Sequence, residues 1–238
     1  MISSTWPFRP SKTPFFYGWV IWIFSTLGIL FSIPGQTMGL AVFTESFIEV
    51  LDLTRTELSL AYLIGTIGSS LFLAKAGKWY DQYGGRFMIS ASSLALSLMV
   101  LYVSFIDVLS LSLGNSTFIS FILISVGYFG VRFFGQGVLT SCSRNVLLLW
   151  FIKRRGLVSG MRSVFVSLGF SLAPLLLAGL IVSYGWRESL WILSLLGGCG
   201  FSFLALIFIR DNPESCGLRA DGLDLGSHES LPLEAESQ

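Results

Sequence analysis

The stretch Gly77-Lys78-Trp79-Tyr80-Asp81-Gln82-Tyr83-Gly84-Gly85-Arg86 is a short, charged segment punctuated by glycines. It lies between two long apolar runs, which cover residues 58–74 and 87–108. A tight polar loop that joins two membrane-spanning helices explains this contrast directly. The stretch therefore predicts a helix–loop–helix unit inside a membrane.

The composition of the whole chain is that of a membrane protein. Of its 238 residues, 53% are hydrophobic and 12% are charged, whereas soluble domains carry about 25% charged residues. The net charge of +1 gives no electrostatic argument for binding nucleic acid. The chain has no P-loop, G-x-S-x-G or H-E-x-x-H motif, and its His and Cys residues lack metal-ligand spacing. We therefore expect a protein that is not an enzyme and holds no metal or other cofactor.

Six apolar runs are long enough to cross about 30 Å of hydrocarbon, which takes about 20 helical residues. They cover residues 17–40, 56–76, 87–108, 117–141, 157–183 and 186–209. Apolar and polar residues do not alternate along them, which argues against a membrane β-barrel. The predicted fold is an all-α integral membrane protein, a six-transmembrane-helix bundle over residues 17–209. It follows an N-terminal segment, 1–16, and precedes a polar linker or tail, 210–238, which we expect to be disordered.

Basic residues gather on one side of the predicted bundle. They are Arg9, Lys12, Lys75, Lys78, Arg86, Lys153, Arg154, Arg155, Arg210 and Arg219. The opposite loops carry Arg55 and Arg187 among acidic residues. Because positive charge gathers in cytoplasmic segments, both termini and the loops after the second and fourth runs are predicted to be cytoplasmic. We expect a multi-pass protein of a bacterial inner or plasma membrane.

The stretch 77–86 resembles a signature of the major facilitator superfamily, G-x-x-x-D-(R/K)-x-G-(R/K)-(R/K), found between spans 2 and 3. Gly77, Asp81, Gly84 and Arg86 match the signature. The chain departs from it at positions 82 and 85, where Gln and Gly replace the usual bases. The resemblance implies that the four matching residues form a conformational loop, which holds two six-helix halves together in the outward-open state.

The residues of this loop also have direct physical roles. Gly77 permits close contact of the second span with a neighbour, and Gly84 and Gly85 allow a chain reversal with positive φ. Asp81 and Arg86 can pair with each other or with the ends of helices. From these physical roles alone, the stretch is a tight turn whose basic residues help to fix the topology of the two spans in the membrane.

Arg132 is a polar residue deep inside the fourth run. It lies about fifteen residues from the start, which is roughly 22 Å at 1.5 Å per residue. An arginine at this depth costs about 2.5–3.5 kcal/mol on insertion scales. It either faces a water-filled cavity, where it attracts an anion or couples to protons, or it bonds to a neighbouring helix. The segment 132–137 resembles the superfamily's span-4 pattern R-x-x-x-G-x-G with one glycine displaced, and its Gln136 joins the predicted cavity.

Two other arginines lie nearer the cytoplasmic ends of their helices. We expect Arg162 to keep its aliphatic stem in the apolar zone while its guanidinium reaches water. For Arg144 the sequence favours neither this arrangement nor a functional role.

The first run carries Pro34-Gly35-Gln36-Thr37 in its second half. Proline removes a backbone hydrogen bond and clashes with the preceding turn, so we expect a kink there. Gln36 and Thr37 then offer hydrogen bonds where backbone carbonyls are freed. They either bind a solute or link helices to each other.

Small residues mark the fifth run. Gly156 and Gly160 are four positions apart, a spacing that lets helix backbones approach closely. Gly169, Ala173 and Pro174 resemble the superfamily's span-5 signature G-x-x-x-G-P, with alanine in place of the second glycine. We expect helix packing and a bend at this point.

Further resemblance, in residues 17–20, 150–157 and 212–218, is to the monocarboxylate-porter and oxalate/formate-antiporter branch. It implies transport of a small organic anion, such as a monocarboxylate, by alternating access between two six-helix halves. The chain looks like an N-terminal half in the lipid bilayer, working with a second half or as a homodimer. The alternative is a non-transporting membrane protein or remnant that acts as an interaction or binding module.

Overall fold

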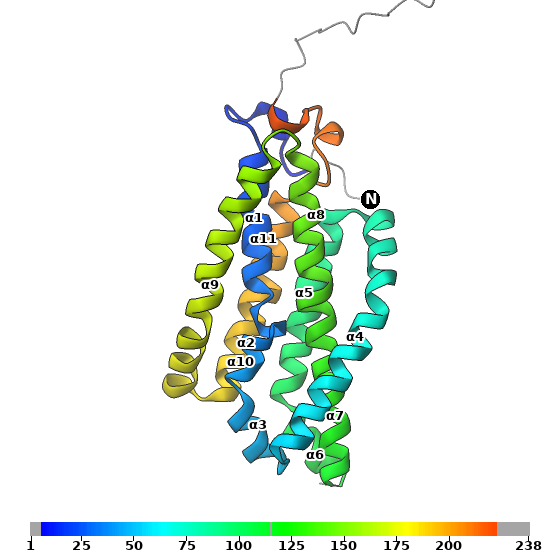
Figure 1. Cartoon of the computed structure of the whole chain (residues 1–238), viewed down its shortest axis with the longest axis vertical. Coiled ribbons are helices and arrows are strands. Elements are labelled where there is room, and N and C mark those ends of the chain that lie inside the picture. Colours follow the sequence, from blue (N-terminus) through cyan, green and yellow to red (C-terminus); the bar gives the residue numbers. More distant parts are fainter. Residues whose placement is uncertain (1–5, 115, 223–238) are drawn as a thin grey trace, which may run out of the picture.

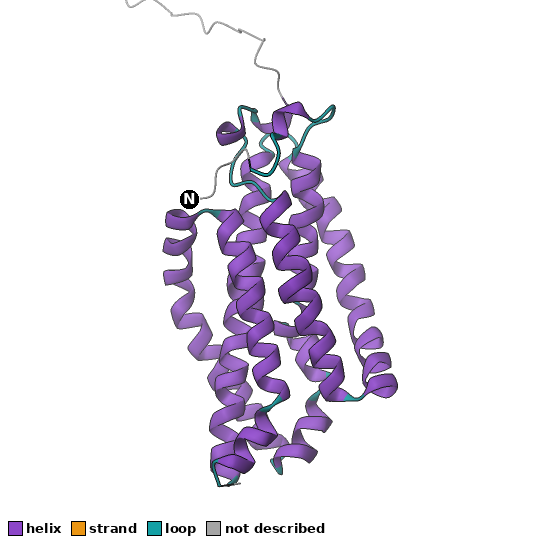
Figure 2. Ribbon diagram, turned by 180° about the vertical axis from the view of Figure 1, so that it is seen from behind, coloured by secondary structure: helices purple, strands orange, loops and turns teal. Residues whose placement is uncertain are grey.

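The computed structural model describes residues 6–114 and 116–222. Throughout this described part the chain is helical, without a strand, and the helices stand side by side along the long axis (Figures 1 and 2). The helices are α1 (Gly18–Phe31), α2 (Thr37–Ala41), α3 (Thr44–Leu51), α4 (Arg55–Tyr83), α5 (Gly85–Ser104), α6 (Ile106–Ser112), α7 (Thr117–Val131), α8 (Thr140–Trp150), α9 (Arg155–Tyr184), α10 (Trp186–Leu195) and α11 (Ser202–Phe208). Shorter helical turns are η1 (Pro10–Lys12), η2 (Ile33–Gly35), η3 (Arg132–Leu139), η4 (Leu196–Phe201), η5 (Glu214–Cys216) and η6 (Ala220–Gly222).

Five helices of the described part are long and apolar enough to cross a membrane. They are Arg55–Tyr83, Gly85–Ser104, Thr117–Trp150, Arg155–Tyr184 and Trp186–Phe208. A shorter apolar helix, Gly18–Phe31, precedes them. The predicted all-α membrane bundle is thus confirmed, with a first span that differs from the other five.

The predicted first span, 17–40, is broken into two helices. α1 ends at Phe31, the tight turn η2 contains Pro34, and α2 starts again at Thr37. Pro34 lacks a backbone N–H and fixes its own φ, which explains why the α-helix stops here. The break therefore leaves the carbonyl oxygen of Gly35 to accept a hydrogen bond from another helix, which Arg132 donates.

Two other spans remain continuous through a wide helical turn. η3 joins α7 to α8, and η4 joins α10 to α11, both with π-type hydrogen bonding. Such turns accommodate an extra residue and recur at functional sites. Their positions are not evident from the apolar runs.

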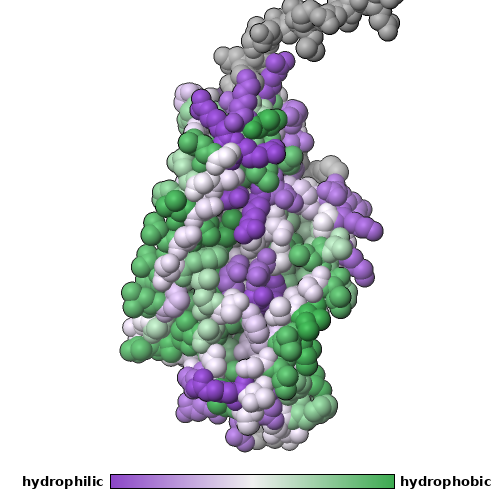
Figure 3. All heavy atoms as spheres, in the orientation of Figure 1, coloured by the Kyte–Doolittle hydropathy of each residue, from purple (hydrophilic) through white to green (hydrophobic). Residues whose placement is uncertain are grey.

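The core lies around α5, which packs against α7, η3, α10, η4 and α11. Buried serines on α5, among them Ser90, Ser93 and Ser97, keep its surface narrow enough for these close contacts. α4 and α9 lie at opposite edges of the bundle (Figure 1), and much of each is exposed. On the face of the bundle shown in Figure 3, hydrophilic groups lie along the middle, between α4 and α9, and apolar surface lies on both sides of them.

α4 is longer than the predicted span 56–76. Its start is fixed by a capping box, in which Thr54 and Glu57 bond to each other's backbone N–H groups. The helix then continues through Gly77 and Asp81 to Tyr83, so the predicted polar loop 77–86 is mostly helix. The chain reverses only at Gly84, whose φ is 83°.

Part of the polar tail packs on the bundle, in contrast to the disordered linker that we expected. Arg210, Cys216 and Ala220 are buried at the end of the bundle where the first described residues also lie. The carboxylate of Asp221 accepts hydrogen bonds from the backbone N–H groups of residues 152–154. Residues 223–238 of the expected disordered tail lie outside the described residues.

Candidate functional site

The break in the first span and the wide turn of the fourth span meet at two glycines. A Cβ atom at Gly35 would collide with the backbone of Val131 and Gly135, and one at Gly135 would collide with Gly35. The two backbones can therefore approach only because neither residue has a side chain. This contact brings the carbonyl oxygen of Gly35 in η2 next to the first residue of η3, which is Arg132.

Arg132 is buried at this contact, with 8% of its surface exposed. Its Nη1 donates to the carbonyl oxygen of Gly35 at 3.4 Å and to Oγ1 of Thr37 at 3.3 Å. The guanidinium lies over the ring of Tyr62, 5.1 Å from the centroid. Its Nε is buried without a hydrogen-bond partner. The ion pairs among the described residues do not include Arg132, so its charge lacks an acidic counterpart there.

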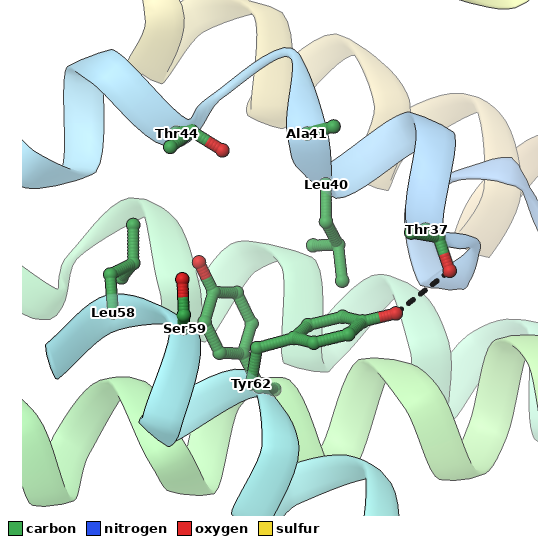
Figure 4. A pocket seen from close by; sticks show the side chains of 8 residues that line it. Thr37, Leu40, Ala41, Thr44, Leu58, Ser59 and Tyr62 are labelled. Atoms are coloured by element: carbon green, nitrogen blue, oxygen red, sulfur yellow. Dashed lines mark hydrogen bonds between the residues drawn. The ribbon is translucent and has the colours of Figure 1, made fainter. Parts of the chain in front are cut away.

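A cavity of about 190 Å³ lies beside this group. Thr37 and Tyr62 line it, and their hydroxyls bond to each other at 2.8 Å (Figure 4). The remaining lining residues are Leu40, Ala41, Thr44, Leu58, Ser59 and Tyr128. Hydroxyls on an otherwise apolar wall, next to a buried cation, are suited to a small solute with one anionic group.

Gln36 and Gln136, which we predicted in the same cavity, lie elsewhere. Gln36 is buried and donates from Nε2 to Oγ of Ser32 at 2.9 Å and to Oγ1 of Thr140 at 3.3 Å. These bonds link the broken first span to α8, the helix-linking role that the sequence left open. Gln136 is exposed on η3. Of the four predicted cavity residues, Arg132 and Thr37 are brought together.

Tyr62 is the site residue that sequence reasoning missed. It lies in the interior of the apolar run 56–76, where a tyrosine needs a partner for its hydroxyl. That partner is Thr37, and the ring also faces the guanidinium of Arg132. The available signal was a tyrosine within an apolar run, two turns from the start of the helix.

The four residues of the predicted loop motif are separated by the structure. Gly77 and Asp81 lie on the last turns of α4, and a Cβ at Gly77 would contact nothing within 4 Å. The close helix contact expected at Gly77 is thus absent among the described residues. Gly85 rather than Gly77 lies at a close approach, because a Cβ there would collide with Val146 of α8.

Arg86 pairs with the tail instead of with Asp81. Its backbone N–H donates to Oδ1 of Asp211 at 2.7 Å, and its Nε donates to the carbonyl oxygen of Leu206 at 2.7 Å. Its Nη2 donates to the carbonyl oxygen of Trp6 at 2.9 Å, and Nη2 of Arg210 donates to the same oxygen at 2.9 Å. We call Trp6, Arg86, Arg210 and Asp211 the terminal junction.

Burial changes the acid–base behaviour of this region. It lowers the pKa of the Arg210 guanidinium, and it raises the pKa of the nearby Cys216 thiol. The nearby cation of Arg210 acts on the thiol in the opposite direction but is the smaller effect. The terminal junction is therefore a hydrogen-bonded assembly, at one end of the bundle, of segments from both ends of the described chain, with Arg86 and Arg210 buried in it.

The span-5 motif lies where α9 packs on α1. A Cβ at Gly169 would collide with the side chain of Leu30, and Ala173 is buried one turn further on. α9 continues through Pro174 to Tyr184 without a break. At Gly156 and Gly160, by contrast, a Cβ would contact nothing within 4 Å, so these two glycines make no helix contact among the described residues.

Comparison with known families accounts for this architecture. A sequence model described as Major Facilitator Superfamily matches residues 26–223, more than four-fifths of the chain. Comparison with curated proteins and with solved structures found no significant match. Because the matched region contains most of the first span and all five longer spans, the chain belongs to the Major Facilitator Superfamily, a family of membrane transport proteins.

Proposed function

We propose that this chain takes part in the transport of a small organic anion, such as a monocarboxylate, by alternating access. The anion would be held by Arg132, with the hydroxyls of Thr37 and Tyr62 orienting it. The observation that carries the proposal is the buried charge of Arg132, which no ion pair among the described residues neutralises. A buried charge without a counter-charge is costly, and a carboxylate in the adjoining cavity offsets that cost.

The chemistry of the group favours a carboxylate over a neutral solute. Arginine presents a planar fork of N–H donors that matches the two oxygens of a carboxylate. Nε of Arg132 is buried and unbonded, so one edge of the fork still has a donor to offer. The resemblance of residues 150–157 to the monocarboxylate-porter branch agrees with this class of solute.

We further propose that a second six-helix unit, either a separate half or another copy of this chain, covers the face seen in Figure 3. Hydrophilic groups on a bilayer-exposed surface are costly, and a second unit would shelter them around a central aqueous path. The open positions of Gly156 and Gly160 on α9 leave room for such a neighbour. The distribution of basic residues favours a cytoplasmic location for the terminal junction.

Binding of lactate tests the anion proposal. The full chain in phosphatidylcholine nanodiscs carries ¹⁵N-labelled arginine, and the Nε signal of Arg132 is assigned from its loss in Arg132→Gln. We expect lactate to shift this signal in a saturable way, whereas lactamide, the neutral analogue, leaves it in place. A saturable shift with both compounds would contradict the requirement for an anion, and no shift with lactate would contradict the site.

A matched variant separates this site from general surface charge. Arg55 is an exposed arginine on the same helix as Tyr62, paired with Glu45. We expect Arg55→Gln to leave lactate binding at Arg132 within twofold of the unmodified chain. In proteoliposomes with a functional second unit, Arg132→Gln should abolish lactate counterflow and Arg55→Gln should preserve it.

A further inference from the structure

Arg162 is a second buried arginine, and it does not extend to water as we expected. It lies on the narrow buried stripe of α9, one turn after Val158, with 9% of its surface exposed. Its Nη1 is completely buried and has no hydrogen-bond partner. It takes part in neither of the ion pairs formed among the described residues. The guanidinium of Arg162 therefore has a charge that no ion pair among the described residues balances and an N–H donor that makes no hydrogen bond.

A second cation lies close to it. Arg144 of α8 is exposed, and its positive charge acts electrostatically on the buried guanidinium of Arg162. The charge of Arg162 is costly because the side chain is buried, and the like charge of Arg144 adds to that cost, which a nearby anion would offset. The pair is therefore a stronger attractant for an anion than either arginine alone.

The helices around the pair supply no acid. The sequences of α1, α2, α8 and α9 contain neither Asp nor Glu. α10 packs against α9, but its Glu188 lies in the first turn, near the end of α9 that is far from Arg162. Asp221 of η6 lies near α8, and its carboxylate oxygens already accept bonds from the backbone N–H groups of 152–154. The described residues therefore offer these two arginines no carboxylate.

The wide turn η3 places Arg144 on the side of the fourth span that carries Arg132. The two residues are twelve positions apart, which is about 18 Å along a helix. At about 100° per residue, a regular α-helix would rotate them about 120° away from each other. One extra residue accommodated in the π-type turn removes about 100° of that offset. Arg144 is thus about three turns from Arg132, at nearly the same angle around the helix.

We infer that Arg144 and Arg162 form a second anion-binding site, nearer the terminal junction, for the carboxylate of a small organic solute. The solute would bind first at one of the two sites and then at the other as it moves along the bundle. The inference rests on the proposed function for the class of solute. Its test measures each site separately, so either can fail without the other.

The test uses the same labelled chain in nanodiscs, with the Arg162 guanidinium signals assigned from Arg162→Gln. We expect lactate, but not lactamide, to shift the Arg162 signal saturably. Arg144→Gln should weaken that binding about tenfold. Arg132→Gln should leave it within twofold, because the two sites are about 18 Å apart. Arg154→Gln, which removes an exposed loop arginine on the same end of the bundle, should also leave it within twofold.

Three results would overturn the inference. The first is an Arg162 signal that ignores lactate while the Arg132 signal responds, which leaves the proposed function standing. The second is equal response to lactamide. The third is an Arg162 signal that does not respond to lactate but differs between discs that hold one chain and discs that hold two. In that case a neighbouring chain would supply the carboxylate. Conversely, a response to lactate at Arg162 but not at Arg132 would support the site at Arg144 and Arg162 and would refute the site at Arg132.

Discussion

Gly84→Ala should destabilise the chain strongly, whereas Gly77→Ala, in the same ten-residue stretch, should not. Gly84 has φ 83° and ψ 162°, a region of backbone conformation that is essentially restricted to glycine. A Cβ there would also lie 2.7 Å from Oδ1 of Asp211. Gly77 is in an ordinary helix, and its Cβ would contact nothing within 4 Å.

The magnitude follows from these two contacts. Forcing alanine into the conformation of Gly84 costs on the order of 1–3 kcal/mol. Displacing Asp211 removes its bond to the backbone N–H of Arg86, worth about 1.5–3 kcal/mol for a charged acceptor. We therefore expect Gly84→Ala to lower the free energy of unfolding by roughly 3–5 kcal/mol. Gly77→Ala should raise it by about 0.5–1 kcal/mol, because alanine is the better helix former.

Unfolding by SDS in mixed micelles measures both values, with helical circular dichroism as the signal. The double variant Gly84→Ala with Asp211→Ala separates the backbone strain from the collision with Asp211. In it the collision with the carboxylate is absent, while the backbone strain at residue 84 remains. Gly84→Ala with wild-type stability, or equal losses for the two glycine variants, would refute the assignment of the chain reversal to Gly84.

Three other substitutions test the site and the terminal junction. Tyr62→Phe removes the hydroxyl bonded to Thr37 but keeps the ring under Arg132, so we expect lactate affinity at Arg132 to fall about fivefold, about 1 kcal/mol. Gln36→Leu should cost about 1–3 kcal/mol in SDS unfolding, because it deletes the buried bonds to Ser32 and Thr140. Burial raises the pKa of the Cys216 thiol, so its rate of alkylation should reach half-maximum above pH 8.5, the ordinary midpoint of cysteine. The stability gained from burying this neutral thiol is complete below that pH and is lost as the pH rises further. Arg86→Gln removes a cation that lowers the pKa of this thiol, so it should move the alkylation midpoint to higher pH.

The sequence predicts the elements that depend on local composition. Long apolar runs predict six spans, because crossing the bilayer requires about 20 apolar residues in any helical context. The last five are single helices long enough to cross a membrane, and the first is broken. Pro34 predicts the disruption of the first span, because proline removes a backbone donor wherever it occurs in a helix. Arg132 stands out as a candidate because a charge at that depth is costly in any fold.

Features that depend on distant residues could not be predicted. The contact between Gly35 and Gly135 joins residues about one hundred positions apart, and it is this contact that places Arg132 beside Thr37. Sequence reasoning offered Arg86 either Asp81 or the end of a helix. In the structure its guanidinium bonds to Leu206 in the last turn of α11 and its backbone N–H bonds to Asp211, and neither residue could be named from the sequence because both are about 120 positions away. Gly77 and Asp81 resembled a loop by composition, but polar residues also form helix once a span leaves the lipid.

The length of α4 has a consequence for how the protein sits in the bilayer. Its 29 residues extend about 43 Å, well beyond the hydrocarbon thickness of about 30 Å. Trp79, Tyr83 and Phe87 are exposed around the overhanging end, and the rings of Tyr83 and Phe87 lie 5.8 Å apart. Trp and Tyr side chains prefer the headgroup layer, so we expect Trp79 and Tyr83 to fix the depth of this end. A change in bilayer thickness must then be absorbed by helix tilt or at the opposite surface, around the short helices α3 and α6.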